Sequence, residues 1–346
     1  MKPSLLRYLA CPACHFALEL RQPDGETIDA NASPEVMTGE LECRGCRARF
    51  AISDGVPRMH AVASPDPTRS RTAASFGYLW ARSVPGDEVY DTRSYHFSKI
   101  ERSLSLDAPK GLVLDAGCGD GIDLANQASR DGVEAIGVEL SDDGCRTSYL
   151  RTRHLARAHV VQADLCRLPF ADGTFDFAYS YGVLHHLGVP ERGLREVIRT
   201  AKPGARIAAY LYEDFSERSA FLRWSLRAAN TTRALTTRLP NRVLFNLCRV
   251  ASPFVFTLFT LPALLGRRVS ILAPLAEHLP FRHGTSPFSL AGDLFDRFSA
   301  PVEFRYSRKT SAAFFSEAGL EHVVVAPERG WMVAGSKPSM GGGQVA

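Results

Sequence analysis

The feature that most constrains the fold is a short apolar segment that runs into a glycine-rich turn. Residues 111–116 (GLVLDA) predict a buried strand, three glycines follow at alternate positions, and helical periodicity begins at Ile122. Glycines permit a tight turn and let the backbone approach a ligand over the carboxyl end of the strand. A second apolar strand, Val133–Val138, leads to Glu139, at a distance from the turn that suits a carboxylate binding ribose hydroxyls. The sequence therefore predicts an α/β fold with a nucleoside site.

The glycine turn differs from a dinucleotide-binding loop, and it resembles a methyltransferase motif. VLDAGCGDG is similar to motif I of class I S-adenosylmethionine-dependent methyltransferases. Later motifs of the family are matched in order by VVQADL at 160–165, LPF at 168–170, FDFAYSY at 175–181, GVLHHL at 182–187 and KPGA at 202–205. The resemblance implies a Rossmann-like fold with a mostly parallel sheet and an antiparallel last strand, S-adenosyl-L-methionine as cofactor, and methyl transfer as the activity.

The resemblance also assigns roles to residues around the expected site. The glycine turn would hold the methionine part of the cofactor, Glu139 the ribose diol, and Asp164 with Leu165 the adenine. The cofactor-binding residues that it implies are Asp115, Gly117, Gly119, Gly121, Glu139, Asp164 and Leu165. Asp115 has the plainer alternative of bracing the loop, and Cys118 that of filling space. We expect Asp123 to be a solvated residue of a first helical turn, where acids favour the helix dipole.

Two adjacent histidines are the catalytic candidates. His185 and His186 fall at the expected mouth of the site, and histidine has a pKa suited to a general base. A general base is needed if the atom that accepts the methyl group is an oxygen or a weakly acidic carbon. If that atom is a better nucleophile, positioning alone supplies much of the rate of methyl transfer. The alternative is that the pair only forms the strand-to-helix turn. Three tyrosines near the expected site either line the pocket or are ordinary aromatic residues of strands, and the sequence does not distinguish these alternatives. They are Tyr179, Tyr181 and Tyr212.

Four of the eight cysteines form two C-x2-C pairs near the start of the chain. The expected metal ligands are Cys11, Cys14, Cys43 and Cys46. Two such knuckles complete a closed tetrahedral site, so we expect one structural zinc per chain with a role in folding or interaction. The gap between the pairs suits a ribbon with a polar excursion at 22–38. Disulfides or a redox C-x-x-C are the alternatives, and neither a secretion signal nor a following βαβ pattern supports them.

The sequence around the cysteines is more specific than their spacing. Residues 5–60, and above all RARFAISDGVPRM at 47–59, resemble the small zinc-ribbon family that activates tRNA and release-factor methyltransferases as a separate subunit. The resemblance implies that a protein partner could bind through the ribbon. After it, the Ser/Pro/Thr/Arg-rich residues 63–75 predict a linker. Residues 76–97 predict an aromatic helix and loop, which either covers the cofactor or packs on the sheet edge.

A long insertion separates the fifth strand of the expected sheet from its last helix. Residues 213–309 carry 14 Lys+Arg and 7 Asp+Glu, and segments 220–229 and 242–264 predict helices with apolar and Arg faces. We favour a basic, apolar cap that closes over a hydrophobic or anionic small molecule at the strand ends. The alternatives are a basic amphipathic surface that rests on a membrane and an RNA-binding surface, for which lysines and interleaved aromatics are sparse.

Composition sets the remaining bounds. The net charge of +4 over 346 residues does not mark a nucleic-acid binder, and the N-terminus lacks the apolar core of a signal peptide. The longest uncharged apolar run, Val250–Gly266, contains two prolines and is shorter than the ~20 residues of a spanning helix. We expect a cytoplasmic protein, with peripheral membrane contact as an alternative.

The sequence thus predicts an ordered set of parts. They are a zinc ribbon at 1–62, a linker and helical cover at 63–110, the cofactor-binding core at 111–212, a helical cap at 213–309, the last helix and strands of the core at 310–337, and a disordered tail at 338–346. The predicted function is methylation of a small or lipid-like metabolite. The alternatives are an rRNA or tRNA methyltransferase and a non-catalytic adaptor that retains cofactor binding. In zinc-bearing rRNA guanine methyltransferases the metal-ligand pattern typically ends in His, and the second cysteine pair of this chain contains no His.

Overall fold

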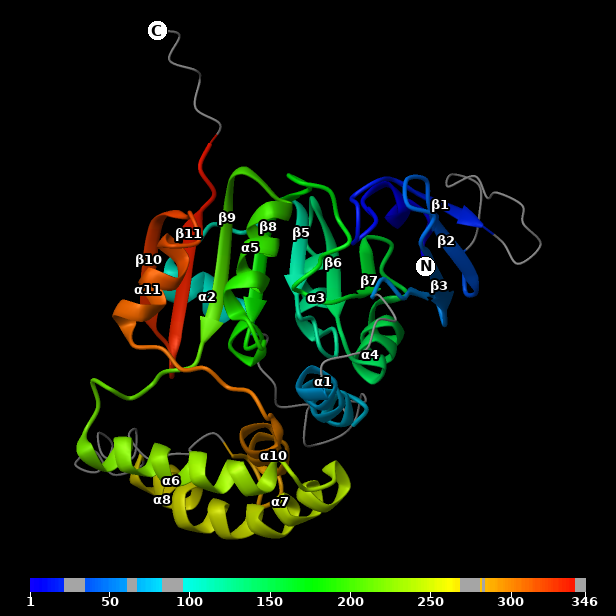
Figure 1. The fold of residues 1–346 in the computed structure, drawn as a ribbon. Coiled ribbons are helices and arrows are strands. Elements are labelled where there is room, and N and C mark those ends of the chain that lie inside the picture. Colours follow the sequence, from blue (N-terminus) through cyan, green and yellow to red (C-terminus); the bar gives the residue numbers. More distant parts are fainter. Residues whose placement is uncertain (22–34, 61–66, 83–95, 268–280, 282–283, 340–346) are drawn as a thin grey trace, which may run out of the picture.

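Two β-sheets organise the chain, and a layer of helices lies beyond one end of the larger sheet (Figure 1). The computed structural model describes residues 1–21, 35–60, 67–82, 96–267, 281 and 284–339. The polar excursion expected between the cysteine pairs and the expected tail therefore fall largely outside the described residues.

The larger sheet has seven strands in the order β10-β11-β9-β8-β5-β6-β7. The strands are β5 (Gly111–Ala116), β6 (Val133–Glu139), β7 (Ala158–Gln162), β8 (Phe175–Tyr181), β9 (Ala201–Leu211), β10 (Glu321–Pro327) and β11 (Trp331–Ser336). Strands β5 to β9 pair in parallel, while β11 is antiparallel to both β9 and β10. The predicted mostly parallel sheet with an antiparallel last strand is confirmed, and the KPGA motif lies within β9.

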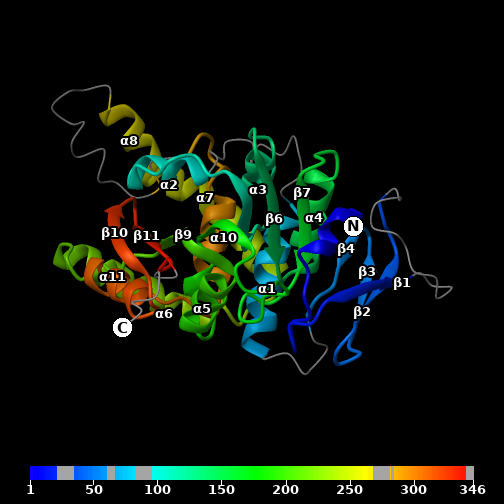
Figure 2. The same ribbon diagram turned by 90° about the horizontal axis from the view of Figure 1, so that it is seen from above.

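Helices cover both faces of this sheet, as Figure 2 shows for α2 and α3 on one face and α5 and α11 on the other. Their bounds are α2 (Phe97–Leu104), α3 (Ile122–Ala128), α4 (Asp142–Thr152), the 3-10 turn η2 (Leu184–His186), α5 (Pro190–Thr200) and α11 (Arg308–Ser316). The central strands are buried on both faces, with Val113, Leu114 and Ile136 at 0% exposure. This explains why they read as continuous apolar runs rather than as alternating patterns.

The N-terminal ribbon forms the second sheet and docks on the β7 edge of the first. Its elements are η1 (Pro3–Arg7), β1 (Leu18–Arg21), β2 (Gly39–Cys43), β3 (Arg49–Ser53) and β4 (Val56–Pro57). The amide of Ala10 donates to Pro169 O at 2.8 Å and that of Met59 to Gln162 O at 2.7 Å. Buried side chains of the ribbon, including Met59, belong to the same hydrophobic cluster as Phe170 of the larger domain. The ribbon and the sheet thus share one core.

The predicted linker at 63–75 is wrong from Pro67 onward, because these residues begin a helix. Helix α1 (Pro67–Trp80) runs across the carboxyl ends of the strands, apart from the faces of the sheet (Figure 1). Pro67 is compatible with a first helical position, where a missing N–H costs nothing. Long-range contacts then fix the helix, among them the Ser75 hydroxyl to Asn241 Oδ1 at 3.3 Å. The polar composition of this segment gives no indication of these contacts.

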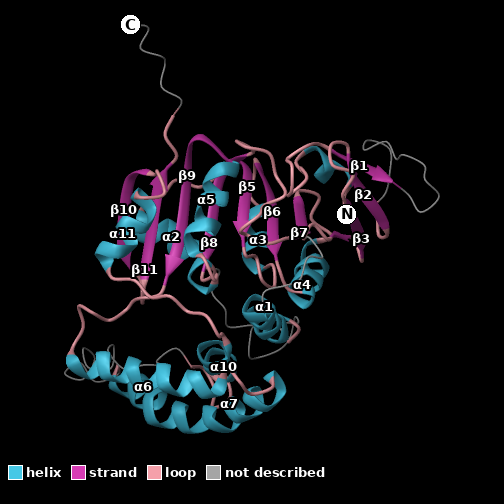
Figure 3. Ribbon diagram, viewed as in Figure 1, coloured by secondary structure: helices cyan, strands magenta, loops and turns pink. Residues whose placement is uncertain are grey.

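The insertion is helical, as predicted, and forms the layer farthest from the sheet (Figure 3). Its helices are α6 (Ala220–Thr236), α7 (Asn241–Val255), the π-helical turn η3 (Phe256–Thr260), α8 (Leu261–Gly266) and α10 (Ala291–Ser299). Helix α10 lies between this outer layer and the carboxyl ends of the strands (Figures 1 and 3). It packs against both α6 and α7.

Helix α7, η3 and α8 form one continuous helix of 26 residues, Asn241–Gly266. Its two prolines do not end it, and the wider π-helical turn lies just before Pro262. The uncharged run Val250–Gly266 is part of this longer helix, in which Arg249 separates it from further apolar residues that begin at Val243. By length and composition this helix is sufficient to span, with a mean hydropathy of 1.6 over its most apolar window. Those criteria are also met by core helices of soluble proteins.

Candidate active site

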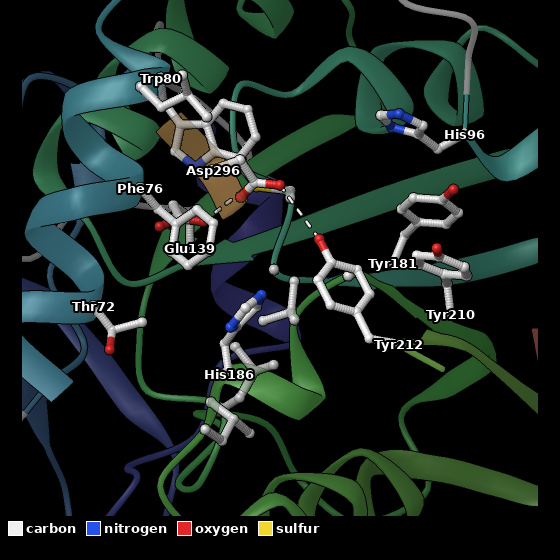
Figure 4. Close-up of a pocket in the computed structure, with 18 of the residues that line it drawn as sticks. Thr72, Phe76, Trp80, His96, Glu139, Tyr181, His186, Tyr210, Tyr212 and Asp296 are labelled. Carbon is white, nitrogen blue, oxygen red and sulfur yellow. Dashed lines mark hydrogen bonds between the residues drawn. The ribbon is translucent and has the colours of Figure 1, made fainter. Parts of the chain in front are cut away.

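A cavity of about 900 Å³ opens at the carboxyl ends of β5, β6 and β8 (Figure 4). Its walls come from the glycine turn, α1, the segment around η2, the end of β9 and α10. Most of the predicted site residues line it, namely Asp115, Gly117, Gly119, Glu139, Asp164, Leu165 and His186. Gly121 and His185 do not line it.

Two glycines shape the wall of the cavity because no side chain fits at their positions. Gly117 has φ +99°, and a Cβ there would lie 2.4 Å from a Val183 methyl group. Gly119 has φ +53°, and its Cβ would lie 2.9 Å from the Trp80 ring. The amide of Gly119 instead donates to Glu139 Oε2 at 3.2 Å. Gly121 has a packing role, since a Cβ there would meet Ser148 of α4 at 2.5 Å.

Two buried carboxylates face the cavity from the ends of β5 and β6. Asp115 is 3% exposed, and among the described residues its Oδ2 has no hydrogen-bond partner. Burial raises the pKa of Asp115 well above its usual value, and the charge of Asp123 raises it further. Burial also raises the pKa of Glu139, although Ser141 donates to Glu139 Oε1 through its amide and its hydroxyl, both at 2.8 Å. A hydrogen bond with Tyr179 lowers the pKa of Asp115 in part. A buried carboxylate oxygen without a partner favours a cation beside it, and Glu139 retains lone pairs for hydroxyl donors.

Helix α1 reaches the end of the cavity where the adenine is expected. Arg69 pairs there with Asp164 Oδ2, while Asp164 Oδ1 accepts from the amide of Cys166 at 3.0 Å. Phe76 and Trp80 of the same helix also line the cavity. Of the two alternatives for residues 76–97, the structure therefore favours a cover for Phe76 and Trp80. Residues 83–95 lie outside the described part of the chain.

Asp123 is not the solvated helix residue that we expected. Its Oδ1 accepts from the amide of Phe97 at 3.0 Å, its Oδ2 lies 3.4 Å from His96 Nδ1, and the residue lines the cavity. The start of α2 packs against the first turn of α3, and this contact between segments 26 residues apart leaves no local pattern around Asp123.

The structure separates the two candidate histidines. His185 is fully buried outside the cavity, with its ring 4.0 Å from that of Tyr212. His186 points its ring toward the cavity (Figure 4). His186 Nδ1 lies 2.7 Å from the carbonyl oxygen of Val302, which can only accept, so Nδ1 carries the proton.

The same contact defines what His186 offers to a ligand. Burial lowers the pKa of His186 to about 4, so the imidazole is neutral near pH 7. With the proton on Nδ1, Nε2 is left as a hydrogen-bond acceptor, and it has no partner among the described residues. Nε2 of His186 can therefore accept a hydrogen bond or a proton from a ligand in the cavity, whereas His185 does not line the cavity.

Aromatic rings form the wall opposite the glycine turn. Tyr181 stacks on His96 at 4.5 Å and on Tyr210 at 4.6 Å, measured between ring centroids. Tyr212 donates to Asp296 Oδ2 at 3.3 Å, and burial raises the pKa of Tyr212 well above its usual value. Tyr181 and Tyr212 are thus pocket residues. Tyr179, at 0% exposure, belongs to the core.

The part of the insertion that closes the cavity is not its basic part. From the insertion, the lining residues are Glu213, Phe215, Ser289, Gly292, Asp293, Asp296, Arg297, Val302 and Arg305, and none comes from α6, α7 or α8. The expected basic cap over the site is therefore wrong in its placement. Helix α10 and its flanks form the lid, with acids and arginines in similar number.

Sequence reasoning missed several lining residues, above all Arg69 and Asp296. Arg69 falls in the segment expected to be a linker. Asp296 meets Tyr212 across 84 residues of sequence, and no local signal in the chain indicates that pairing. Asp123, predicted to be solvated, also lines the cavity.

The four predicted metal ligands lie together in the ribbon, with all four sulfur atoms within 4.8 Å of one another. The Sγ atoms of Cys11 and Cys46 are 3.6 Å apart and those of Cys14 and Cys43 are 3.4 Å apart. A tetrahedral zinc with Zn–S bonds of about 2.3 Å requires sulfurs about 3.8 Å apart, so the cluster is consistent with a zinc site. All four cysteines are free.

Comparison with known proteins agrees with this geometry in two separate regions. Residues 114–209 match the methyltransferase domain family and residues 2–55 match the Trm112p-like protein family. The chain therefore joins an S-adenosylmethionine-dependent methyltransferase domain to an N-terminal Trm112p-like domain with a four-cysteine cluster.

Individual relatives resemble only part of the chain. An uncharacterized 37.1 kDa protein in transposon TN4556 of Streptomyces fradiae is 35% identical over 140 residues, which covers 38% of this chain and 40% of that protein. The botryococcene C-methyltransferase of Botryococcus braunii is 29% identical over 137 residues, 39% of this chain and 36% of that enzyme. The chain thus spans less than half the length of these curated relatives. Among solved structures, a complex of the Haloferax volcanii Trm112 methyltransferase activator with a methyltransferase covers 79% of this chain and 100% of its own at 15% identity, with a TM-score of 0.46.

Proposed function

We propose that this chain transfers the methyl group of S-adenosylmethionine to a small or lipid-like acceptor bound beneath α10. The observation that supports this most directly is that one cavity combines a glycine-shaped wall with the buried carboxylate of Asp115, whose Oδ2 has no hydrogen-bond partner among the described residues. A nucleoside that carries a sulfonium cation fits both features, since the glycines leave room for it and the carboxylate favours a positive charge.

Different residues of the chain would bind different parts of the cofactor. Asp115 would accept from the ammonium of the methionine part, and Glu139 from the ribose hydroxyls. Asp164 would accept from the adenine amino group, and its carboxylate would be shared between that amino group and Arg69, its present ion-pair partner. Bound there, the cofactor supplies a methyl group on a sulfonium, an electrophile that needs no further activation.

His186 and the aromatic wall would act on the acceptor. The unprotonated Nε2 of His186 can take a proton from an acceptor oxygen or carbon, while Tyr181, Tyr210 and Phe76 offer apolar surface around the acceptor. The cavity is enclosed by α1 and α10 and holds about 900 Å³. These dimensions favour a small molecule, and the aromatic lining favours a lipid-like one.

Calorimetry with S-adenosylmethionine tests the cofactor site. The Gly119→Arg variant should lose binding, because a side chain there enters the cavity toward Trp80. Gly132→Arg is the matched control, since Gly132 also has a positive φ but has open space around its Cβ position. Equal affinity of Gly119→Arg and wild type would refute the site.

The pH dependence of methyl incorporation into a lipid extract tests His186. Since its pKa is about 4, turnover should stay level from about pH 8 to about pH 6, whereas a base with an ordinary histidine pKa near 6.5 would lose about three quarters of its active form. His186→Gln should lower kcat by about a hundredfold, and the exposed His154→Gln should not. An unchanged kcat in His186→Gln would remove the histidine from the reaction.

A further inference from the structure

The outer surface of the insertion carries an apolar stripe that faces solvent. Along Asn241–Gly266, exposed apolar side chains recur every three or four residues, on the side away from α10. The members of this stripe are Val243, Leu247, Val250, Phe254, Leu258, Leu261 and Leu265. Phe254 is 72% exposed and Val250 66%, and only 22% of the helix's most apolar window is buried. We call these seven residues the outer stripe.

Helix α6 adds to this surface. Trp224 and Leu235 are 65% and 66% exposed and lie on the opposite side of the helix from Arg233. Arg233 is buried, pairs with Glu303 and donates to Ala300 O at 2.8 Å. The apolar residues of α6 therefore also point away from the rest of the protein, within the layer farthest from the sheet (Figure 1).

The same layer is strongly basic. Residues 218–267 contain eight arginines and no Asp or Glu. Arg218 and Arg233 have acidic partners in Glu213 and Glu303. The other six are exposed, and the described part of the chain provides no ion pair for them; they are Arg223, Arg227, Arg238, Arg242, Arg249 and Arg267.

We propose that the outer stripe and these arginines form a docking surface for an anionic lipid bilayer, with the helix lying in the plane of the headgroups. Helices with one apolar face and arginine-rich flanks bind at that interface, and each cation near an anionic surface adds to the affinity. The chemistry of the surface matches both halves of the interface. The apolar side chains enter the acyl boundary while the guanidinium groups meet lipid phosphates.

The packing of the helix argues for lying on the bilayer rather than crossing it. Leu244, Phe245 and Cys248 are buried on the inner side, and the Phe245 ring meets that of Phe295 on α10 at 5.6 Å. A helix that crossed the bilayer would expose this inner side and place Arg249 within the apolar layer. Charges at that depth are costly.

Other occupants fit the surface less well. A second copy of the same surface would bring unpaired arginines toward one another without acids to meet them. A nucleic acid would pair with the arginines but leave the outer stripe in water. Only a bilayer of anionic lipid satisfies both.

Docking would bring the bilayer close to the active-site cavity. Helix α10 packs on α7 through Phe295, and its Asp293, Asp296 and Arg297 line the cavity. One helix thus separates the proposed lipid surface from the proposed acceptor site. The inference goes beyond the proposed function, because lipid binding does not require catalysis.

Flotation of the full chain with vesicles tests the surface. Wild type should bind vesicles of equal parts phosphatidylcholine and phosphatidylglycerol, and bind vesicles of phosphatidylcholine alone at least tenfold more weakly. The double variant Leu247→Glu with Phe254→Glu should lose binding, and Arg242→Gln with Arg249→Gln should weaken it about tenfold or more. Each variant's melting temperature and S-adenosylmethionine affinity should match wild type, which separates this result from failure of the active site.

Matched controls lie elsewhere on the protein. Leu150→Glu on α4 and Arg195→Gln on α5 alter exposed residues of the same kinds and should leave vesicle binding unchanged. Three results would overturn the proposal. They are no binding of wild type to anionic vesicles, a dimer that the Leu247→Glu and Phe254→Glu changes dissociate in the absence of vesicle binding, and RNA binding through the arginines without lipid binding.

Discussion

The ribbon and the outer layer of the insertion are two additions to the same methyltransferase core. Similar apolar residues are buried in the ribbon and exposed to solvent in the outer layer. In the ribbon, Leu20, Leu41 and Ile52 are at most 1% exposed. In the outer layer, the side chains of the outer stripe are of similar size and remain more than one-third exposed. Buried apolar surface stabilises a fold, whereas a large exposed apolar patch marks an interaction site.

The arginines show the same contrast. Ribbon arginines have carboxylate partners, as in Arg21 with Glu42 at 2.6 Å and Arg44 with Glu19 at 2.7 Å. In the outer layer, arginines such as Arg242 and Arg249 have no such partner among the described residues. Composition alone makes both regions Arg-bearing and apolar. The arrangement separates them, because the ribbon residues are buried or paired, whereas the outer stripe and these arginines face solvent.

Loss of the metal should have the largest effect. Cys43→Ser removes one of the four clustered sulfurs, and structural zinc contributes more free energy than a typical domain retains on folding. Because the ribbon shares a core with the β7 edge, we expect the melting temperature of the whole chain to fall by about 10 °C or more. Metal analysis should give one zinc per chain for wild type.

The control for that variant is Cys166→Ser, which alters a cysteine outside the cluster. It should retain zinc and unfold near the wild-type temperature. A Cys43→Ser protein with unchanged zinc content and unchanged unfolding would show that the ribbon is not a metal-dependent module.

Matched leucine truncations measure the contrast directly. Leu41→Ala in the ribbon should lower the free energy of unfolding by about 2–5 kcal/mol, because Leu41 is fully buried. Leu247→Ala in the outer layer removes the same atoms from a side chain that is 54% exposed, so its effect should stay within about 0.5 kcal/mol. Denaturant unfolding of both variants checks this. Similar losses would mean that the outer layer is part of the folded core.

A smaller effect is expected at the joint between ribbon and sheet. Glu134 of β6 accepts from Arg7 and Tyr8 of the ribbon, each at 2.7 Å, and lies 2.9 Å from His159 Nε2. Burial alone would raise the pKa of Glu134, but hydrogen bonds from His159 and Tyr8 and the charges of His159 and Arg7 lower it to about 2. Since Glu134 remains partly exposed, we expect Glu134→Gln to cost about 1 kcal/mol at pH 7.

The sign of that effect gives its pH dependence. A carboxyl group whose pKa is lowered on folding contributes stability above its unfolded pKa, and loses it as the pH falls through the folded value. The difference between wild type and Glu134→Gln should therefore shrink between about pH 4.5 and about pH 2. A difference that is constant over this range would contradict the charge-based account of the joint.

The sequence predicted the parts of the molecule that local patterns encode. Strands β5 and β6, the glycine turn between β5 and α3, and the four cysteines each carry their signal within a few residues. The same holds for the helices of the insertion, whose apolar periodicity is visible along the chain.

What the sequence did not predict depends on contacts between distant segments. Arg69 meets Asp164 and Asp296 meets Tyr212 only after folding, so neither pairing leaves a local pattern. The net charge of the insertion likewise could not show that its arginines lie on the outer layer, with α10 between them and the cavity. The sequence predicted a basic lid over the active site, whereas in the structure the basic surface lies on the far side of α10 from the cavity.

The most direct test of the whole account is the destination of the methyl group. The purified chain, incubated with S-adenosylmethionine labelled in its methyl group, a lipid and metabolite extract and total RNA, should transfer label to the lipid or small-molecule fraction, and Gly119→Arg should transfer none. Label that enters RNA alone would contradict the proposed function.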